Sequence, residues 1–209
     1  MGERNSVYVY KGCMPDDFRD TATSVVVELG GRLEWDVHPD PMDAAMLTSH
    51  RGLVHAAYIH LKEGEIAKRI GSRLAIPWIN IRIQEGSLWD YSLFHGEPHL
   101  DNFSTLPEYW EEDDQEWLAT QRGKLDVLAR TWQVEESAIA NYLKSWGYEL
   151  IGDAFRTTLR GKAYENDRHE YGDIWQMTDF LRALGAHDPN WGEPHSVPRL
   201  LEFPSKRRP

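Results

Sequence analysis

The sequence predicts an α+β fold in which a ferredoxin-like (βαββαβ) antiparallel sheet is extended by a hairpin and packed against a C-terminal helical region. Three observations support this prediction. Residues 77–103 carry the densest strand pattern in the chain. A strand–helix–strand order occurs twice before that pattern is complete. After residue 103 the apolar residues take up helical spacing.

Residues 77–103 predict a three-stranded antiparallel meander. The isoleucines of residues 79–83 alternate with polar side chains, which is the period of a half-buried strand. Turn-forming glycine, serine and proline then separate this strand from two further strands at 88–94 and 99–103.

The predicted sandwich consists of two strand–helix–strand units, and the last strand of the second unit is also the first strand of the meander. Apolar spacing and flanking Gly and Pro residues predict a strand, a helix and a strand in each of them. We expect the first unit at 7–10, 15–29 and 32–37, a loop at 38–52 with one helical turn at 42–46, and the second unit at 54–61 and 63–75, completed by the first strand of the meander. We expect the isoleucine face of that strand to meet the helices of the two units.

The C-terminal half predicts helices. Residues 123–132 and 134–146 have helical spacing, whereas 148–160 fits either a helix or a strand. Asp173 is expected to cap an amphipathic helix that ends at Gly185. We expect a sandwich at 1–103, helices at 104–185 and a Pro-rich extended tail at 186–209, docked through Trp191 and Leu200–Leu201. These parts should form one compact body, since no flexible linker separates them.

Composition limits the class of protein. Of 209 residues, 41% are hydrophobic and 27% charged, which is typical of a globular chain. A net charge of −11 opposes nucleic-acid binding, which depends on clustered Lys and Arg. The apolar run 24–29 is too short to cross a bilayer, and the charged N-terminus is no secretory signal. The single cysteine, Cys13, excludes an internal disulfide and fits the cytoplasm. We therefore expect a cytoplasmic protein without nucleic-acid or membrane partners.

Two histidines and an aspartate in the meander are weak candidates for a metal site. Imidazole and carboxylate groups suit zinc or iron, and His95, His99 and Asp101 lie close in sequence. Gly96 and Pro98 exclude the helix that would bring the two imidazoles together, and no zinc motif is present. Turn histidines that only form hydrogen bonds are the alternative, so we predict no metal or cofactor.

Residues 125–143 have the apolar spacing of a helix-turn-helix. Gln133 stands where the turn glycine is usual, and the second helix begins with Glu135 and Glu136, which repel phosphate. A helical hairpin packed into the core explains the same spacing.

An acidic block flanked by tryptophans is the candidate surface for a protein partner. Such blocks are usually solvated faces, but carboxylates beside aromatic rings also suit a basic protein surface. The predicted partner-binding residues are Trp110, Glu111, Glu112, Asp113, Asp114 and Trp117.

Signals for catalysis are weaker. Asp90 would be a general-base candidate if the fold buried it, whereas an exposed Asp90 would be ordinary. Cys13 precedes a helix, but Asp16 and Asp17 oppose a thiolate there. Nucleophile-elbow, P-loop and dinucleotide motifs are absent from the sequence.

These observations predict a soluble, acidic, Trp-rich protein-binding module without catalysis. A toxin-neutralising (immunity-type) or regulatory role is the concrete form of this hypothesis. The alternative is a small-molecule-binding protein or a metal-assisted enzyme with a pocket between the sheet and the C-terminal helices, where His95, His99, Asp101 or Asp90 would supply the polar groups.

Overall fold

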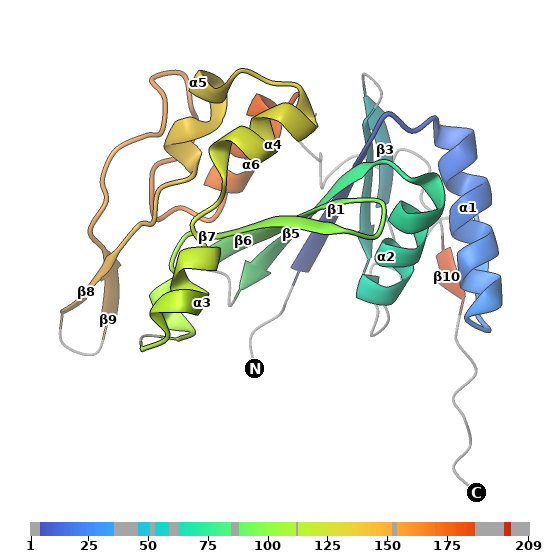
Figure 1. Ribbon diagram of the computed structural model, residues 1–209, viewed down its shortest axis with the longest axis horizontal. Helices are drawn as coiled ribbons and strands as arrows, with labels where there is room; N and C mark the ends of the chain where they lie inside the picture. Colours follow the sequence, from blue (N-terminus) through green and yellow to red (C-terminus); the bar gives the residue numbers. More distant parts are fainter. Residues whose placement is uncertain are drawn as a thin grey trace, which may run out of the picture. The chain divides into compact units, whose positions relative to one another are not determined.

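The chain has mixed α and β content with an antiparallel sheet (Figure 1). The computed structural model describes residues 5–35, 46–50, 53–58, 63–84, 88–111, 113–151, 154–186 and 199–201. The chain divides into two compact units: unit 1 holds residues 1–4, 79–93 and 99–188, and unit 2 holds residues 5–78, 94–98 and 189–209. Strands β5 (Pro77–Gln84) and β6 (Leu88–His95) contribute residues to both units.

In unit 2, three strands lie in the order β3-β4-β1. β1 (Asn5–Lys11) pairs antiparallel with β4 (Leu53–Tyr58), and β4 pairs antiparallel with β3 (Met46–His50). The predicted loop at 38–52 is therefore wrong for residues 46–50, which form a strand; the expected helical turn lies almost wholly outside the described residues.

Two helices pack beside these strands, and both follow the predicted spacing. α1 (Pro15–Glu28) has a proline in its first turn and Asp16 and Asp17 near its positive end. The helix stops before Gly30, whose φ of 81° is a left-handed conformation that glycine adopts without strain. α2 (Glu63–Leu74) lies against α1 (Figure 1), and Arg73 donates a hydrogen bond to Glu28 across the two helices.

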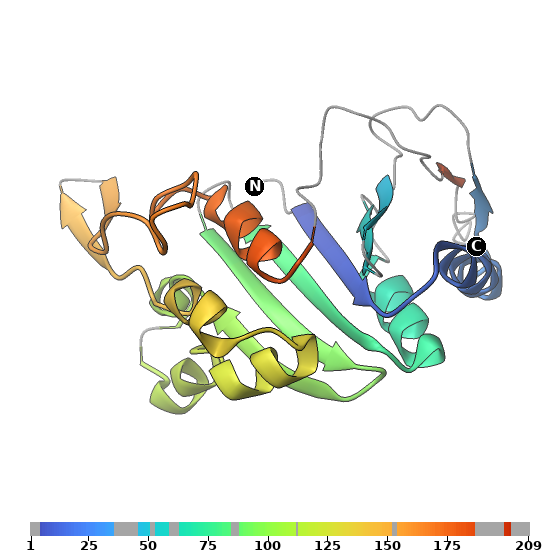
Figure 2. The same cartoon turned by 90° about the horizontal axis from the view of Figure 1, so that it is seen from above.

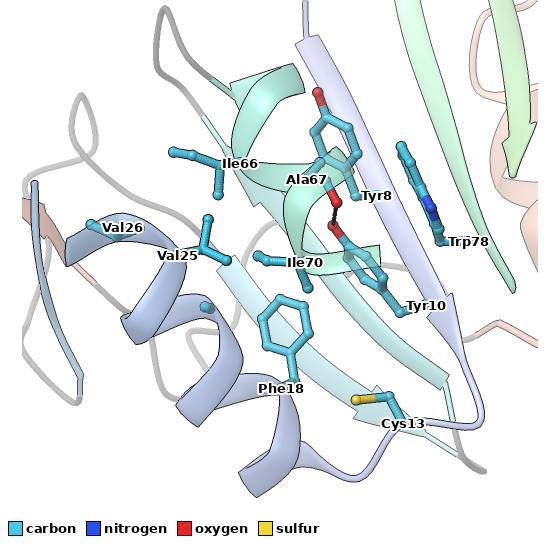
Figure 3. Packing of buried hydrophobic residues seen from close by; sticks show 11 residues of the cluster. Tyr8, Tyr10, Cys13, Phe18, Val25, Val26, Ile66, Ala67, Ile70 and Trp78 are labelled. Carbon is cyan, nitrogen blue, oxygen red and sulfur yellow. Dashed lines mark hydrogen bonds between the residues drawn. The ribbon is translucent and has the colours of Figure 1, made fainter. Parts of the chain in front are cut away.

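The core of unit 2 forms between β1, α1 and α2 (Figure 3). The side chains of Phe18 and Val25 from α1 meet Ile70 from α2, and the Tyr10 hydroxyl donates a hydrogen bond to the Ala67 carbonyl at 3.3 Å. Burial of these apolar side chains is the main stabilising contribution in this unit.

Trp78 completes this core. Its indole stacks on Phe94 at a centroid distance of 4.1 Å, and its Nε1–H donates to the Gly96 carbonyl at 2.8 Å. A Cβ built on Gly71 of α2 would lie 2.2 Å from Trp78 Nε1, so the ring occupies space that only glycine leaves. The isoleucine face of β5 was expected to meet α1 and α2. That expectation is wrong, since the cluster takes Trp78 from β5.

We predict that Gly71→Ala lowers the free energy of unfolding by about 1–3 kcal/mol, because the added methyl group overpacks the helix against Trp78. Gly64→Ala in the same helix is the matched control. Its Cβ would have no neighbour within 4 Å, and alanine favours a helix by up to about 1 kcal/mol. Urea denaturation of both variants tests this, and equal stability of the two would contradict the packing role of Gly71.

Cys13 is buried, at 5% exposure, and its thiol donates to the Met14 carbonyl. Burial raises its pKa to about 11, and the negative charge of Asp17 adds to the shift.

We predict that Cys13 resists alkylation at pH 8, where only about one thiol in a thousand is a thiolate at such a pKa. The rate with iodoacetamide should rise about tenfold per pH unit up to pH 10 and should rise sharply in urea. A native rate equal to that of an unfolded chain would show that the thiol is accessible and unperturbed.

A separate pair of strands joins the segment after α1 to a C-terminal segment of unit 2. β2 (Arg32–Glu34) pairs antiparallel with β10 (Arg199–Leu201), so that Leu33 faces Leu200 in the register. Residues 199–201 of the predicted tail form the strand that pairs with β2, whereas Trp191 lies outside the described residues. The strand predicted at 32–37 is shorter, and its partner is β10.

Unit 1 is built on the meander. β5, β6 and β7 (His99–Ser104) follow the predicted ranges and lie in that order. α4 (Leu125–Trp132), α5 (Glu136–Ile139) and α6 (Gln176–Ala183) lie on one side of these strands (Figures 1 and 2). Trp89 and Tyr91 face them, since both rings stack on Phe180 of α6 at 5.2 and 5.8 Å.

Two helical predictions need correction, and the open choice between helix and strand at residues 148–160 is resolved as strand. The helix expected at 134–146 ends at Ile139 and continues only as a 3-10 turn, η2 (Ala140–Tyr142). Residues 148–160 contain the hairpin β8 (Tyr148–Ile151) and β9 (Ala154–Thr157). α6 starts at Gln176, after a turn in which Asp173 accepts a hydrogen bond from the Trp175 backbone N–H. Gly185, with a φ of 79°, ends α6 as expected.

Across the described residues, no helix has the length and apolar character that a bilayer crossing requires.

Candidate binding surface and cavity

A 3-10 turn presents two aromatic rings to solvent. In η1 (Pro107–Tyr109) the Tyr109 N–H donates to the Leu106 carbonyl and the Trp110 N–H to the Pro107 carbonyl. Leu106 and Pro107 are buried and anchor the turn, whereas Tyr109 and Trp110 are 37% and 40% exposed. The two rings meet edge to face at 5.0 Å. The backbone therefore holds an aromatic pair outward.

The acidic block that follows has mixed roles. Asp114 caps α3 (Gln115–Thr120), because its Oδ1 accepts a hydrogen bond from the Trp117 N–H at 2.8 Å. The side chains of Glu111, Asp113 and Glu116 are exposed, and Trp117 is half-buried. Glu112 lies outside the described residues. We call residues 109–111 and 113–117 the acidic–aromatic segment.

A cavity of about 630 Å³ lies between β7 and α3. It is lined by residues 99–102 of β7, by Glu116, Ala119 and Thr120 of α3, and by Lys124. Most of its lining residues have polar or charged side chains, and these residues carry both signs of charge, so the cavity can hold a polar ligand.

The buried carboxylate of Asp101 holds the two sides of this cavity together. Asp101 is 3% exposed, and its Oδ2 accepts hydrogen bonds from the Tyr91 hydroxyl and from the Lys124 backbone N–H, both at 2.8 Å. Gly123 also donates its N–H to the Asn102 carbonyl. Its φ is 72°, and a Cβ there would lie 3.1 Å from the Tyr91 hydroxyl, so glycine lets the loop approach the sheet.

A second hydrogen-bond network involves Asn102, the residue that follows Asp101. Asn102 Oδ1 accepts from the Ser92 hydroxyl at 2.8 Å and lies 2.9 Å from His99 Nε2. If Asn102 Oδ1 accepts both bonds, His99 must carry a proton on Nε2. These contacts orient the polar side chains at the β7 side of the cavity.

The weak metal candidates are divided between the two units. His99 and Asp101 line the cavity of unit 1, whereas His95 is an exposed residue of unit 2 whose backbone N–H donates to the Pro98 carbonyl. Through the described ranges, no three His, Cys, Asp or Glu side chains are grouped so that they could hold a metal ion.

Asp90 is buried, at 4% exposure, and accepts hydrogen bonds from Arg82 Nε at 2.5 Å and from Gln84 Nε2 at 3.0 Å. These contacts make the carboxylate one half of an ion pair within the strands. Arg82 is half-exposed, so this pair lies at the edge of the core.

The helix-turn-helix spacing corresponds to a helical hairpin. Gln133 adopts a left-handed conformation with a φ of 55°, and the Val134 N–H donates to the Ala129 carbonyl across the turn. The second helix, α5, has 4 residues, and Glu136 at its start and Glu135 just before it are exposed. It therefore offers neither the length nor the charge of a recognition helix.

The acid-rich loop before α6 and α6 itself each contain one buried carboxylate that sequence reasoning did not single out. Asp167 accepts from the Tyr142 hydroxyl at 2.6 Å, and Asp179 accepts from the backbone N–H groups of Arg168 and His169. Asp179 also pairs with Arg182 at 2.8 Å. Both groups tie this loop to the helices.

The residues that α3 and the loop after it contribute to the cavity were not expected from the sequence. Lys124, Thr120 and Glu116 carry no motif, and only the approach of α3 to β7 brings them beside His99 and Asn102.

Comparisons with protein families, with curated proteins and with solved structures find no match for this chain.

Tyr91 provides a test of the Asp101 network. Burial raises the pKa of its phenol well above the usual value of 10.0, and the charge of Asp101 and the hydrogen bond to it add to the shift. The folded chain therefore holds this proton more tightly than the unfolded chain. The resulting stability is complete below about pH 10 and is lost as the pH rises above it.

We predict that Tyr91→Phe lowers the free energy of unfolding at pH 7 by about 1–3 kcal/mol, because Asp101 loses a buried donor. The variant should also show a smaller loss of stability between pH 9 and pH 11 (about one pH unit on either side of the ordinary tyrosine pKa). Urea denaturation across this range measures both effects, and an unchanged alkaline slope would contradict the buried, raised-pKa state of Tyr91.

Proposed function

We propose that the chain is a non-catalytic protein-binding module whose acidic–aromatic segment engages a basic surface of a partner protein. The observation that carries this proposal is the exposed Tyr109–Trp110 pair, held on a buried turn and followed by exposed carboxylates.

The two kinds of side chain have complementary roles in such an interface. Tryptophan and tyrosine supply most of the binding energy in many interfaces, because their large rings lose little conformational entropy on contact. Carboxylates attract a basic partner and set its orientation, and the net charge of −11 strengthens that attraction at a distance.

Rigidity of the segment also favours binding. The hydrogen bonds of η1 fix the backbone below Trp110, and the Asp114 cap fixes the start of α3. A surface that is already ordered loses less entropy when a partner binds.

A toxin-neutralising (immunity-type) or regulatory role fits this proposal, with a basic toxin or a basic regulated protein as the partner. The alternative function is a small-molecule-binding protein or a metal-assisted enzyme, and the cavity between β7 and α3 is the observation that favours its small-molecule form. Under the main proposal the chain itself needs no cofactor.

The ferredoxin-like arrangement is the corresponding proposal for the fold. The elements β1, α1, β3, β4, α2 and β5 follow the βαββαβ order along the chain. The antiparallel pairs β1–β4 and β3–β4 support it, because they correspond to pairs of that fold.

The interface is tested by comparing two charge reversals. Glu111→Lys with Asp113→Lys changes the segment and leaves the Asp114 cap intact, whereas Glu165→Lys with Glu170→Lys changes the net charge equally at exposed sites elsewhere in unit 1. Trp110→Ala removes the exposed ring.

We predict that a basic partner, captured from the source cells and then purified, binds the control reversal about as well as the unmodified chain. Its affinity should fall about 30-fold for Trp110→Ala, the loss expected when a central aromatic side chain is removed. The Glu111/Asp113 reversal should weaken it and flatten its salt dependence. Equal effects of the two reversals would show that net charge alone attracts the partner and would reject the segment as its site.

A further inference from the structure

The cavity between β7 and α3 contains two opposite charges that do not pair with each other. Glu116 stands on the α3 wall and Lys124 on the loop that follows, and both side chains are exposed. In the part of the chain that the structure describes, no ion pair or side-chain hydrogen bond engages either group. Two opposite charges at one cavity are therefore available to a ligand.

The backbone around both charges is held in place. The Lys124 N–H donates to Asp101, which is 3% exposed, and α3 is capped by Asp114 two residues before Glu116. Asn102 and Thr120 also line the cavity, and the Asn102 side chain is oriented by Ser92. The fold thus sets the backbone positions of Glu116 and Lys124, and their charged side chains reach into solvent.

Simple ions suit this cavity poorly. An anion attracted by Lys124 would meet the carboxylates of Glu116 and Asp101, and a cation attracted by Glu116 would meet Lys124. A ligand that carries an ammonium group and a carboxylate satisfies both walls, and a cavity of about 630 Å³ has room for an amino acid or a short peptide.

We propose that this cavity binds a small zwitterion of the amino-acid or short-peptide class, with its ammonium group at Glu116 and its carboxylate at Lys124. Hydrogen bonds to Asn102 and Thr120 orient the ligand between the two charges. This site is separate in function from the proposed protein interface, although Glu116 lies in the acidic–aromatic segment.

The test uses NMR titration of the intact chain with L-glutamine and with the dipeptide L-alanyl-L-glutamine, which distinguish a free amino acid from a peptide. N-acetyl-L-glutamine lacks the ammonium group, and L-glutaminamide lacks the carboxylate. Saturable shifts are expected at the backbone amides of Thr120 and Lys124 and at the side-chain amide of Asn102. Each blocked ligand should bind at least about tenfold more weakly, which is the loss of about 1.4 kcal/mol.

Variants of the two charges identify the contacts. Glu116→Gln and Lys124→Met should each weaken binding about tenfold. In Lys124→Met, the hydrogen bond from the backbone N–H of residue 124 to Asp101 is kept, because it does not involve the lysine side chain. The double exchange of Glu116→Lys with Lys124→Glu keeps both charges at the cavity and should restore part of the affinity, with the ligand reversed.

The absence of saturable shifts with either zwitterion would overturn the proposal, as would equal binding of the blocked ligands. Partner capture by the same Glu116→Gln variant is a separate measurement, so loss of one activity is distinguishable from loss of the other.

Discussion

The buried carboxylate of Asp101 is the contact on which the candidate cavity between β7 and α3 depends. One oxygen accepts hydrogen bonds from Tyr91 in the neighbouring strand and from the backbone of Lys124. The cost of burying a charge is offset only when such donors surround it. That requirement holds the loop after α3 against β7, and so it places Glu116, Thr120 and Lys124 around one cavity.

The same principle recurs through unit 1. Asp90, Asp167 and Asp179 are also buried, and each accepts hydrogen bonds from side chains or backbone groups of another element or loop. Some of the acidic residues that give this chain its negative net charge therefore have a structural role. The acids that remain exposed beside Trp110 are the ones available to a partner, which is why the reversal of Glu111 and Asp113 is more informative than a change at Asp114.

Unit 2 depends on shape complementarity. Gly71 leaves room for the indole of Trp78, and Phe94 and the Gly96 carbonyl complete its surroundings. A strand alternates its side chains between two faces, so the pattern of β5 alone showed that two faces existed. Which helices each face would meet was a property of the packing, and the expected partner of the isoleucines was wrong for this reason.

Local patterns in the sequence determined the elements that depend on local interactions. The apolar spacing of α1 and α2, the alternation in β5–β7 and the glycine after α6 predicted these elements closely, because neighbours in the chain set helical and strand periods. The sequence also determined the exposed acidic block and the single cysteine. Only the tertiary structure decided that β2 pairs with β10, that Asp101 and Asp179 are buried, and that the cavity forms beside α3. These features depend on residues far apart in the chain, and a contact of that kind leaves no periodic signal in one sequence.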